Sequence, residues 1–406
     1  MSRGFATGIV LCALVAGVWG LLHVAWYSHS QIVDYGVYQT YGDDMVHAHQ
    51  VPYRDFAVEY PPAALPVFAA PSLDTGYGYR PTFRFLMLVC DMGLVLGVAA
   101  IAGFWPGVAA ALAPLALGSV VISRFDFWPA ALAVLAVAFL LRRHLYLSAV
   151  LLGTAFAAKL WPAALAPLIV VWLARTSDLR SAMRWLLTAV ATAAAWFLPF
   201  VVLSPGGVGH SFHAQLSRPL QIESLGGSIL LAIHHATGSS LHMVSSFGSQ
   251  NLSGTGVHAA ELATTIVGLA ALVGVWLMFV AGAPTRERLL ASCAAAVAAL
   301  VAFDKVFSPQ FMIWLIPFVL VVRGLRGAVA GVLLYLALIL TQTWFPAHYW
   351  DLPLNFAPTQ SGEVLARDLC VVVLFVVLAW PSLQHEMFGE HRSRLEALQR
   401  VRTQVE

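Results

Sequence analysis

Five carboxylates follow the first apolar segment of this chain, between Asp34 and Pro62. They are Asp34, Asp43, Asp44, Asp55 and Glu59. A carboxylate beside a membrane can take the proton of a substrate hydroxyl, and ionisable residues near membrane depth usually have a function. We favour Asp34 as a general base because it lies only a few residues beyond the apolar segment. Glu59, which the following Tyr60-Pro61-Pro62 holds extended, and Asp44 are the alternatives.

A second set of polar residues lies at the ends of later apolar segments. Its members are Arg124 and Asp126, Lys159, Arg218, Gln221 and Glu223, Asp304, Lys305, Ser308 and Gln310, and His348, Tyr349 and Asp351. Charges at membrane depth are costly and usually face a partner or a cavity. We therefore expect one polar cavity at the membrane surface, with cations for an anionic group and a carboxylate for a proton.

Each of these residues also has a structural interpretation. Lys159 and Lys305 are the only lysines of the chain. Either can bind a phosphate, or can extend from a helix end towards water. Arg124 and Asp126 are as well suited to an internal salt bridge as to a substrate contact. His348 is suited either to a structural role or to contact with substrate or phosphate.

Metal and cofactor chemistry have little support in the sequence. The pairs His47 with His49 and His234 with His235 resemble metal ligands only weakly. We expect no metal and no cofactor. Asp91, inside an apolar segment, is expected to be a buried structural acid.

Composition places the chain in a membrane. Of its 406 residues 60% are hydrophobic and 10% charged, and the mean hydropathy is +0.79. Soluble domains have about 25% charged residues. No basic tract or nucleic-acid motif occurs, so we expect no nucleic-acid partner. The sequence predicts an all-α polytopic membrane protein in contact with membrane lipids.

Apolar segments near the length needed to cross a bilayer indicate about 10–12 transmembrane helices. They lie at about 7–26, 84–103, 107–122, 126–141, 145–158, 160–174, 185–203, 259–281, 289–303, 311–323, 327–342 and 363–380. We expect one membrane domain over residues 1–406, with long outer loops at 28–83 and 204–258 and a cytoplasmic tail at 381–406. Turns that carry arginine alternate with turns that carry aspartate or histidine. The positive-inside rule then places both termini in the cytoplasm and the polar cavity outside.

Six short motifs together resemble a known family. They are DYGVY at 34–38, VPYRDFAVEYPP at 51–62, SRFDFWPA at 123–130, AAKLWP at 157–162, RPLQIESL at 218–225 and DKVFSPQF at 304–311. Each is weak alone, but their order and spacing are similar to those of the GT-C-fold membrane glycosyltransferases. The chain resembles in particular glycosyltransferase family 87, the polyprenyl-phosphate-mannose-dependent α-mannosyltransferases.

The resemblance implies a sugar, most often mannose, carried on a polyprenyl phosphate and transferred with inversion to a glycolipid or glycan acceptor. It implies an active site at the outer face of the cytoplasmic membrane, where nucleotide sugars are not available, and Asp34 matches the position of the base. Candidates for binding the donor phosphate are Lys305, Arg218, Lys159, His348 and Gln310. Other candidates for substrate binding are Tyr38, Glu59, Tyr60, Arg124, Asp126, Gln221, Glu223 and Ser308.

Three other interpretations remain open. The chain could be a transporter or flippase of an anionic or lipid-linked solute, although no broken midplane spans or paired repeats are evident. It could use another donor, such as an arabinofuranosyl or glucosyl lipid phosphate. It could also be a catalytically inactive relative, which the presence of Asp34 and Lys305 argues against.

Overall fold

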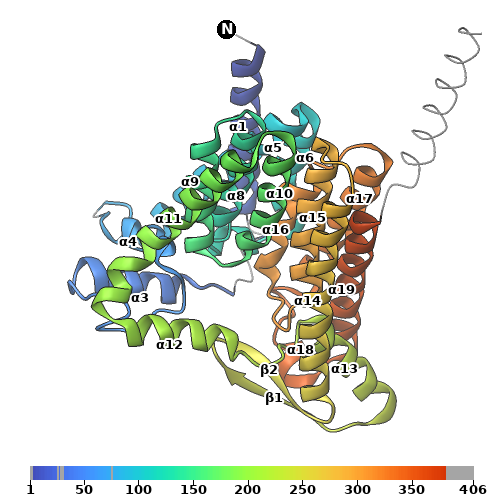
Figure 1. The fold of residues 1–406 in the computed structure, drawn as a ribbon. Coiled ribbons are helices and arrows are strands. Elements are labelled where there is room, and N and C mark those ends of the chain that lie inside the picture. Colours follow the sequence, from blue (N-terminus) through green and yellow to red (C-terminus); the bar gives the residue numbers. More distant parts are fainter. Residues whose placement is uncertain (1–2, 25–26, 28–31, 75, 381–406) are drawn as a thin grey trace, which may run out of the picture.

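A computed structural model describes residues 3–24, 27, 32–74 and 76–380, so the expected tail at 381–406 lies outside the described residues. The chain is almost entirely helical (Figure 1). The first half contains α1 (Arg3–Leu22), α3 (Tyr35–Val46), η1 (Pro62–Ala64), α4 (Leu65–Ser72), α5 (Tyr79–Ala102), α6 (Phe104–Leu117), α7 (Val120–Ser123), α8 (Phe127–Leu141), α9 (Leu145–Ala158), η2 (Trp161–Leu165), α10 (Ala166–Thr176) and α11 (Leu179–Leu203). The second half contains α12 (Pro205–Leu216), α13 (Leu225–Thr237), β1 (Leu241–Ser246), β2 (Ser249–Gly254), α14 (Val257–Ala281), α15 (Arg286–Phe303), η3 (Pro309–Phe311), α16 (Met312–Val319), α17 (Gly324–Trp344), α18 (Asp351–Asn355) and α19 (Pro358–Ala379).

Within the described residues, helices cover most of each of the twelve apolar segments, although the segment at 107–122 is divided between α6 and α7. Within the described residues, five helices are long and apolar enough to cross a membrane, namely α1, α5, α11, α14 and α17. Shorter apolar helices pack among them, and most of their buried side chains belong to one continuous hydrophobic core. The expectation of an all-α polytopic membrane protein is therefore confirmed.

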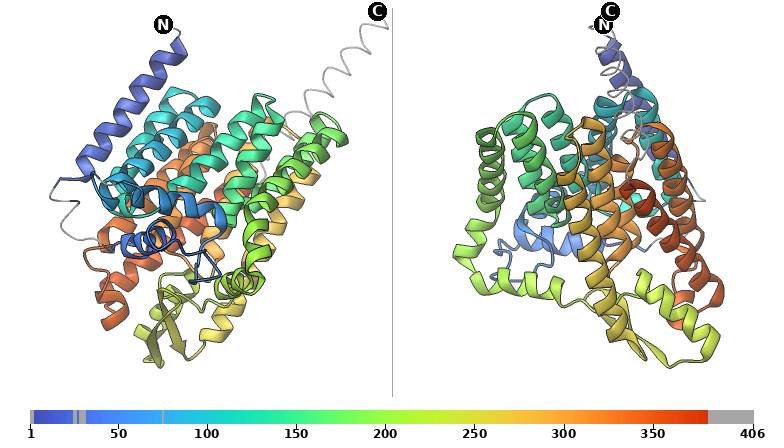
Figure 2. Two further views of the ribbon diagram at one scale, coloured as in Figure 1. Left: turned by 90° about the vertical axis from the view of Figure 1, so that its left-hand side faces the viewer. Right: turned by 45° about the vertical axis from the view of Figure 1, so that its right-hand side comes forward.

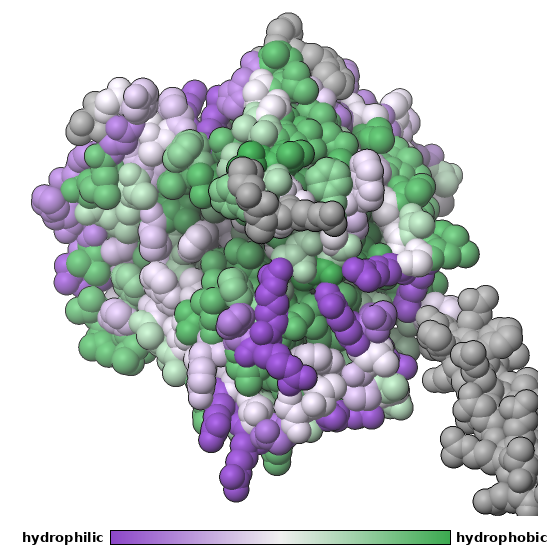
Figure 3. Space-filling view, turned by 90° about the horizontal axis from the view of Figure 1, so that it is seen from above, coloured by the Kyte–Doolittle hydropathy of each residue, from purple (hydrophilic) through white to green (hydrophobic). Residues whose placement is uncertain are grey.

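Arginines gather at one end of the helix bundle, which we call the arginine end. Arg175, Arg286 and Arg326 donate hydrogen bonds to carbonyls at the last turns or just past the ends of α14, α5 and α19. The last carbonyls of a helix lack intrahelical partners and carry partial negative charge, so cations stabilise them. Seen from this end, hydrophilic side chains group together beside hydrophobic ones (Figure 3).

The two long loops lie at the opposite end, which we call the loop end. There α3, α12, α18 and the β1–β2 hairpin meet the ends of the long helices (Figures 1 and 2). The first loop folds into α3, η1 and α4, and α5 begins at Tyr79 rather than at residue 84. The second loop forms α12, α13 and the hairpin, and α14 begins at Val257. The Ser224 hydroxyl accepts a hydrogen bond from the Gly227 amide and caps α13.

The motif RPLQIESL lies between the hairpin and the turn that follows α15. Leu252 N donates to Leu220 O and Ile222 N donates to Gln250 O, so the segment pairs with β2 through an isolated antiparallel bridge. Gln221 N donates to Lys305 O on its other side. Two motifs that are distant in sequence are thus held together by backbone hydrogen bonds.

Candidate functional site

Asp34 forms an ion pair with Arg124 at the loop end. Asp34 directly precedes α3, and Arg124 lies in the turn between α7 and α8. The Arg124 side chain is 7% exposed and that of Asp34 is 28% exposed. The Tyr38 hydroxyl also donates to Asp34 Oδ2, at 3.3 Å. Both contacts use Oδ2, and within the described residues no hydrogen bond reaches Oδ1. Asp34 is therefore oriented by two partners and keeps one carboxylate oxygen for a substrate.

Asp126 holds Lys159 beside this ion pair. Lys159 Nζ lies 2.6 Å from Asp126 Oδ1, and Trp314 Nε1 donates to the same oxygen at 2.7 Å. Asp126 stands just before α8, whereas Lys159 stands in extended conformation where α9 ends and η2 follows. The break between the two expected spans at 145–158 and 160–174 therefore places Lys159 at the site.

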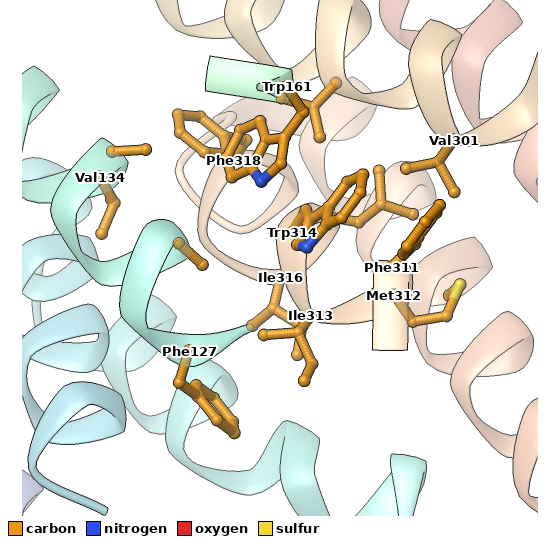
Figure 4. Packing of buried hydrophobic residues seen from close by; sticks show 14 of the residues in the cluster. Phe127, Val134, Trp161, Val301, Phe311, Met312, Ile313, Trp314, Ile316 and Phe318 are labelled. Atoms are coloured by element: carbon orange, nitrogen blue, oxygen red, sulfur yellow. The ribbon is translucent and has the colours of Figure 1, made fainter. Parts of the chain in front are cut away.

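Aromatic rings surround the Lys159 ammonium. It lies 5.0 Å from the ring centroid of Phe125, 5.1 Å from that of Phe311 and 4.9 Å from that of Trp314. Trp314 in turn stacks on Trp161, with centroids 5.4 Å apart (Figure 4). Cation–π contacts stabilise a partly desolvated cation. The position of Lys159 is thus fixed by the Asp126 carboxylate and by three aromatic side chains.

Lys305 is also paired. Its Nζ lies 3.0 Å from Glu261 Oε1 and donates to the carbonyl of Leu216 at 3.0 Å. These bonds join the turn after α15 to α14 and to the end of α12. The structure therefore gives Lys305 a bridging position that the sequence did not reveal, because Glu261 lies inside an apolar segment.

Arg218 differs from both lysines. In the part of the chain that the structure describes it forms no ion pair, and its Nε atom is buried without a hydrogen-bond partner. It lies within electrostatic range of Lys159 and of Asp304. Arg218 is partly buried, and a guanidinium that is partly removed from water without a counter-ion favours the approach of an anion. Arg218 is accordingly the residue of this group best suited to receive an anionic ligand.

Three amide and hydroxyl side chains line the same region. Gln221 Nε2 donates to Ser308 Oγ at 3.2 Å, so these two predicted residues meet. The Oε1 atom of Gln310 is buried and has no hydrogen-bond partner among the described residues. Such groups can orient a hydroxyl-rich ligand, because each can both donate and accept through its side chain.

Glu223 belongs to a buried charged network behind the site. The Arg367 guanidinium donates to the Glu223 carbonyl and to Asp368 Oδ1, the latter at 2.8 Å. Ser228 Oγ donates to Asp368 Oδ2 at 2.8 Å. Arg367 and Asp368 were not among the predicted site residues. Sequence reasoning could have found them, because they are two adjacent charges inside the apolar segment at 363–380.

The aromatic candidates do not all reach the surface. Tyr38 is buried, with its ring stacked on those of Phe68 and Phe83, so only its hydroxyl acts at Asp34. Tyr60 is partly exposed and packs edge-on against Tyr38. It also packs edge-on against Phe68 and Phe125, so neither tyrosine is free of aromatic neighbours.

Within the described residues, Glu59 and His348 form no hydrogen bond or ion pair with Asp34 or Arg124. Glu59 is exposed and helps to line a small pocket with Leu160 and Gln215. His348 is 57% exposed and faces Asp351, with Nδ1 3.3 Å from Oδ2. Asp91 is fully buried and accepts a hydrogen bond from Trp19, as a structural acid does.

No group of three or more potential metal ligands occurs within the described ranges. The site instead consists of one accessible carboxylate, a row of fixed cations and several amides and hydroxyls. This arrangement can accept a proton from a hydroxyl and stabilise an anion beside it.

Comparison with known proteins agrees with this chemistry. The model of glycosyltransferase family 87 matches residues 58–309, which is more than half of the chain. No curated protein matches the chain. The matched region contains three of the six motifs in full and parts of two more, together with most of the cations described above. The chain therefore belongs to glycosyltransferase family 87 and is a membrane-embedded glycosyltransferase.

Proposed function

We propose that this protein transfers mannose from a polyprenyl phosphate to a glycolipid or glycan acceptor at the outer face of the cytoplasmic membrane. The observation that carries the proposal is the Asp34–Arg124 ion pair, which leaves Asp34 Oδ1 without a hydrogen bond within the described residues, near the cations Lys159 and Arg218. Arg124 lies within electrostatic range of Lys159, and Lys159 within range of Arg218. Arg124 and Lys159 thus connect the proposed base, Asp34, with Arg218, the proposed site for the phosphate.

In the proposed reaction the acceptor oxygen attacks the anomeric carbon of the sugar. The acceptor proton passes to Asp34 Oδ1, the new C–O bond forms, and the bond to phosphate breaks with its electron pair on the phosphate. Arg218 then stabilises the charge that grows on the leaving phosphate, with Lys159 and Lys305 adding fixed positive potential. Preorganised charge of this kind is often the largest contribution to catalysis.

Inversion at the anomeric carbon is supported by the different environments of the nearby carboxylates. Direct displacement needs one base, whereas a double displacement needs a second carboxylate as nucleophile. Asp126 is buried and engaged by Lys159 and Trp314, and Glu223 is buried beside Arg367. Of the three carboxylates nearest to Arg124, Asp34 is the one with an accessible oxygen.

The arginine end supports the proposed orientation. Loops rich in arginine remain on the cytoplasmic side of a membrane, which places the loop end and the site outside. A donor there must be carried by lipid. The side of α11 that carries Leu187, Ala191, Ala195 and Trp196 is an open surface, which suits contact with a hydrocarbon chain. The family match favours sugar transfer over transport of a solute.

The decisive experiment uses purified protein in lipid nanodiscs with radiolabelled polyprenyl-phosphate-mannose and a membrane lipid extract as acceptor. We expect Asp34→Asn to lower transfer by about 10²–10⁴-fold, the usual contribution of a general base. Asp44→Asn is the matched control, because Asp44 lies on α3 and its side chain forms no hydrogen bond within the described residues. Transfer that survives in folded Asp34→Asn protein would move the base elsewhere. Transfer of glucose or arabinofuranose instead of mannose would change the donor.

A further inference from the structure

Two arginines of α5 lie at the loop end and form no ion pair within the described residues. Arg80 is exposed and Arg84 is partly exposed, and they stand four residues apart near the start of the helix. Neither is among the cations of the proposed reaction. Outer turns of membrane proteins carry few arginines, so in the proposed orientation this pair calls for a reason.

One tyrosine ring gathers both guanidinium groups. The Cζ atom of Arg80 lies 5.7 Å from the ring centroid of Tyr35, and that of Arg84 lies 5.5 Å from it. Arg84 Nε donates to the Tyr35 hydroxyl at 2.7 Å, and this hydroxyl donates to the carbonyl of Ile122. Tyr35 is 1% exposed, so its ring is fixed by its surroundings. Cation–π contacts therefore hold the two arginines together without a carboxylate.

Most donors of the two guanidinium groups are unused. Within the described residues, neither the two Nη atoms of Arg84 nor any nitrogen of Arg80 has a hydrogen-bond partner. A guanidinium presents its N–H groups as a planar fork that matches two oxygens of a phosphate. The pair thus offers several donors, in accessible positions, to a single anion.

The acids nearest to the arginines have other partners. Asp74, in the loop before α5, accepts a hydrogen bond from Thr82 Oγ1 at 2.5 Å and two more from backbone amides. Asp34 pairs with Arg124. The sequence between α1 and Asp34 contains no acidic residue. An anion that neutralises the two arginines must therefore come from outside the described part of the chain.

Apolar side chains continue from the arginines along α5. Phe85 is 61% exposed and Val89 is 49% exposed, and residues four apart lie on one side of a helix. Because α5 is long and apolar enough to cross a membrane, these two side chains face the hydrocarbon of the bilayer. The arginines then lie at the level of the head groups. A free phosphate could use only the arginines, whereas a phospholipid fits both parts of this surface.

We propose that Arg80 and Arg84 bind the phosphate of an anionic phospholipid whose acyl chains lie along Phe85 and Val89. The phosphate also offsets the repulsion between two like charges. Tyr35 directly follows Asp34 in the chain, so the bound lipid fastens the start of α3 to α5 beside the proposed base. This binding does not require that the protein transfer a sugar.

Photo-crosslinking tests the site on the full chain in phosphatidylcholine nanodiscs. The probes are phosphatidylglycerol and phosphatidylcholine that carry the same diazirine-labelled acyl chain, and mass spectrometry maps the labelled residues. We expect phosphatidylglycerol to label α5 around Phe85 and Val89 about tenfold more than phosphatidylcholine does, because arginines attract an anionic head group. The double variant Arg80→Gln with Arg84→Gln should label equally with both lipids. Equal labelling of the natural protein by both lipids overturns the proposal.

The chain offers a matched control at the arginine end. Arg180 and Arg184 are exposed and occupy the second and sixth positions of α11, as Arg80 and Arg84 do in α5. Arg180→Gln with Arg184→Gln should keep the preference for phosphatidylglycerol at α5. A preference lost in this control would reflect net charge alone and would overturn the site.

Two further measurements separate the site from a change of fold and from free phosphate. Arg80→Gln alone leaves the Arg84–Tyr35 hydrogen bond in place, and it should already lower the labelling by phosphatidylglycerol. Unchanged labelling in this variant contradicts a shared site. Short-chain phosphatidylglycerol should displace the probe at concentrations at which inorganic phosphate does not. Equal displacement by both would indicate a site for free phosphate and overturn the lipid assignment. No sugar donor is present, so a failure of mannosyl transfer leaves these results unaffected.

Discussion

The Asp34 carboxylate and the Arg124 guanidinium form an ion pair that joins the residue before α3 to the turn before α8. The pair favours the ionised form of the carboxylate, which is the form that a general base needs. It also fixes the direction of Asp34 before any substrate arrives. Arg124 itself is fixed, because it lies among buried side chains and donates to the carbonyl of Ile32.

Replacement of Arg124 should therefore impair catalysis more than binding. Arg124→Gln removes the cation, and we expect kcat to fall about 10²-fold because Asp34 loses its orientation. Arg124→Lys keeps the charge but not the planar fork of donors, so we expect a smaller loss, about tenfold. Steady-state kinetics of mannosyl transfer checks both values. A normal kcat in Arg124→Gln would show that Asp34 needs no such partner.

Asp126 and Lys159 should depend on each other for stability. Asp126→Asn leaves the Lys159 charge desolvated, and breaking a buried ion pair from one side costs about 3–5 kcal/mol. We expect the double variant Asp126→Asn with Lys159→Met to recover most of that loss. Thermal and denaturant unfolding in detergent measures the four members of this cycle. Strictly additive effects would mean that the two side chains do not interact.

Arg218 and Lys305 should contribute unequally to donor phosphate binding. Arg218→Gln removes an unpaired guanidinium and should lower kcat/KM for the donor about 10²-fold, which is typical for a lost charge-stabilising group. Lys305→Gln removes a charge that Glu261 already balances, so its effect should be less than about tenfold. Titration with polyprenyl phosphate, the product of the proposed reaction, gives the same comparison without turnover. An effect of Lys305→Gln as large as that of Arg218→Gln would assign the phosphate to Lys305.

Glu223 should also make stability depend on pH. Burial raises its folded-state pKa from the ordinary 4.5 to about 7, so the folded protein holds this proton more tightly than the unfolded chain. The resulting stabilisation is complete below about pH 4.5 and is lost as the pH rises through about 7. Unfolding temperatures measured between pH 5 and 8 should fall with pH in the natural protein and fall less in Glu223→Gln. A parallel fall in both proteins would assign the pH dependence to other groups.

The helices were predictable from sequence because the bilayer imposes a simple rule on length and hydropathy. Within the described residues, helices cover most of each of the twelve apolar segments, and α3, α12 and the β1–β2 hairpin of the two long loops lie at the loop end. Hydropathy could not reveal the helical structure within the loops, such as α12 and α13. These elements depend on tertiary packing and on local caps, such as Ser224.

The composition of the site was predictable, but its pairing was not. The motifs identified Asp34, Arg124, Asp126, Lys159 and Arg218 as polar groups in an apolar chain. Residue types alone could not show that Arg124 binds Asp34 and that Asp126 binds Lys159, because the sequence pairs Arg124 with its near neighbour Asp126 equally well. Contacts across distant helices decide the pairing. They also bring in Trp314, Glu261 and Arg367, whose positions in apolar segments gave little indication of a role.

The turn at Lys159 has a consequence for how the protein enters its membrane. The helical segments on either side of it, α9 and η2 with α10, are each shorter than the roughly 20 residues that cross a bilayer unaided. They are best inserted together, as a pair with the lysine at the tip. Asp126 precedes Lys159 in the chain, so the growing polypeptide has already delivered the negative partner when the ammonium crosses. In the proposed orientation, this order of synthesis lowers the barrier for translocating Lys159, because its counter-ion is already in place.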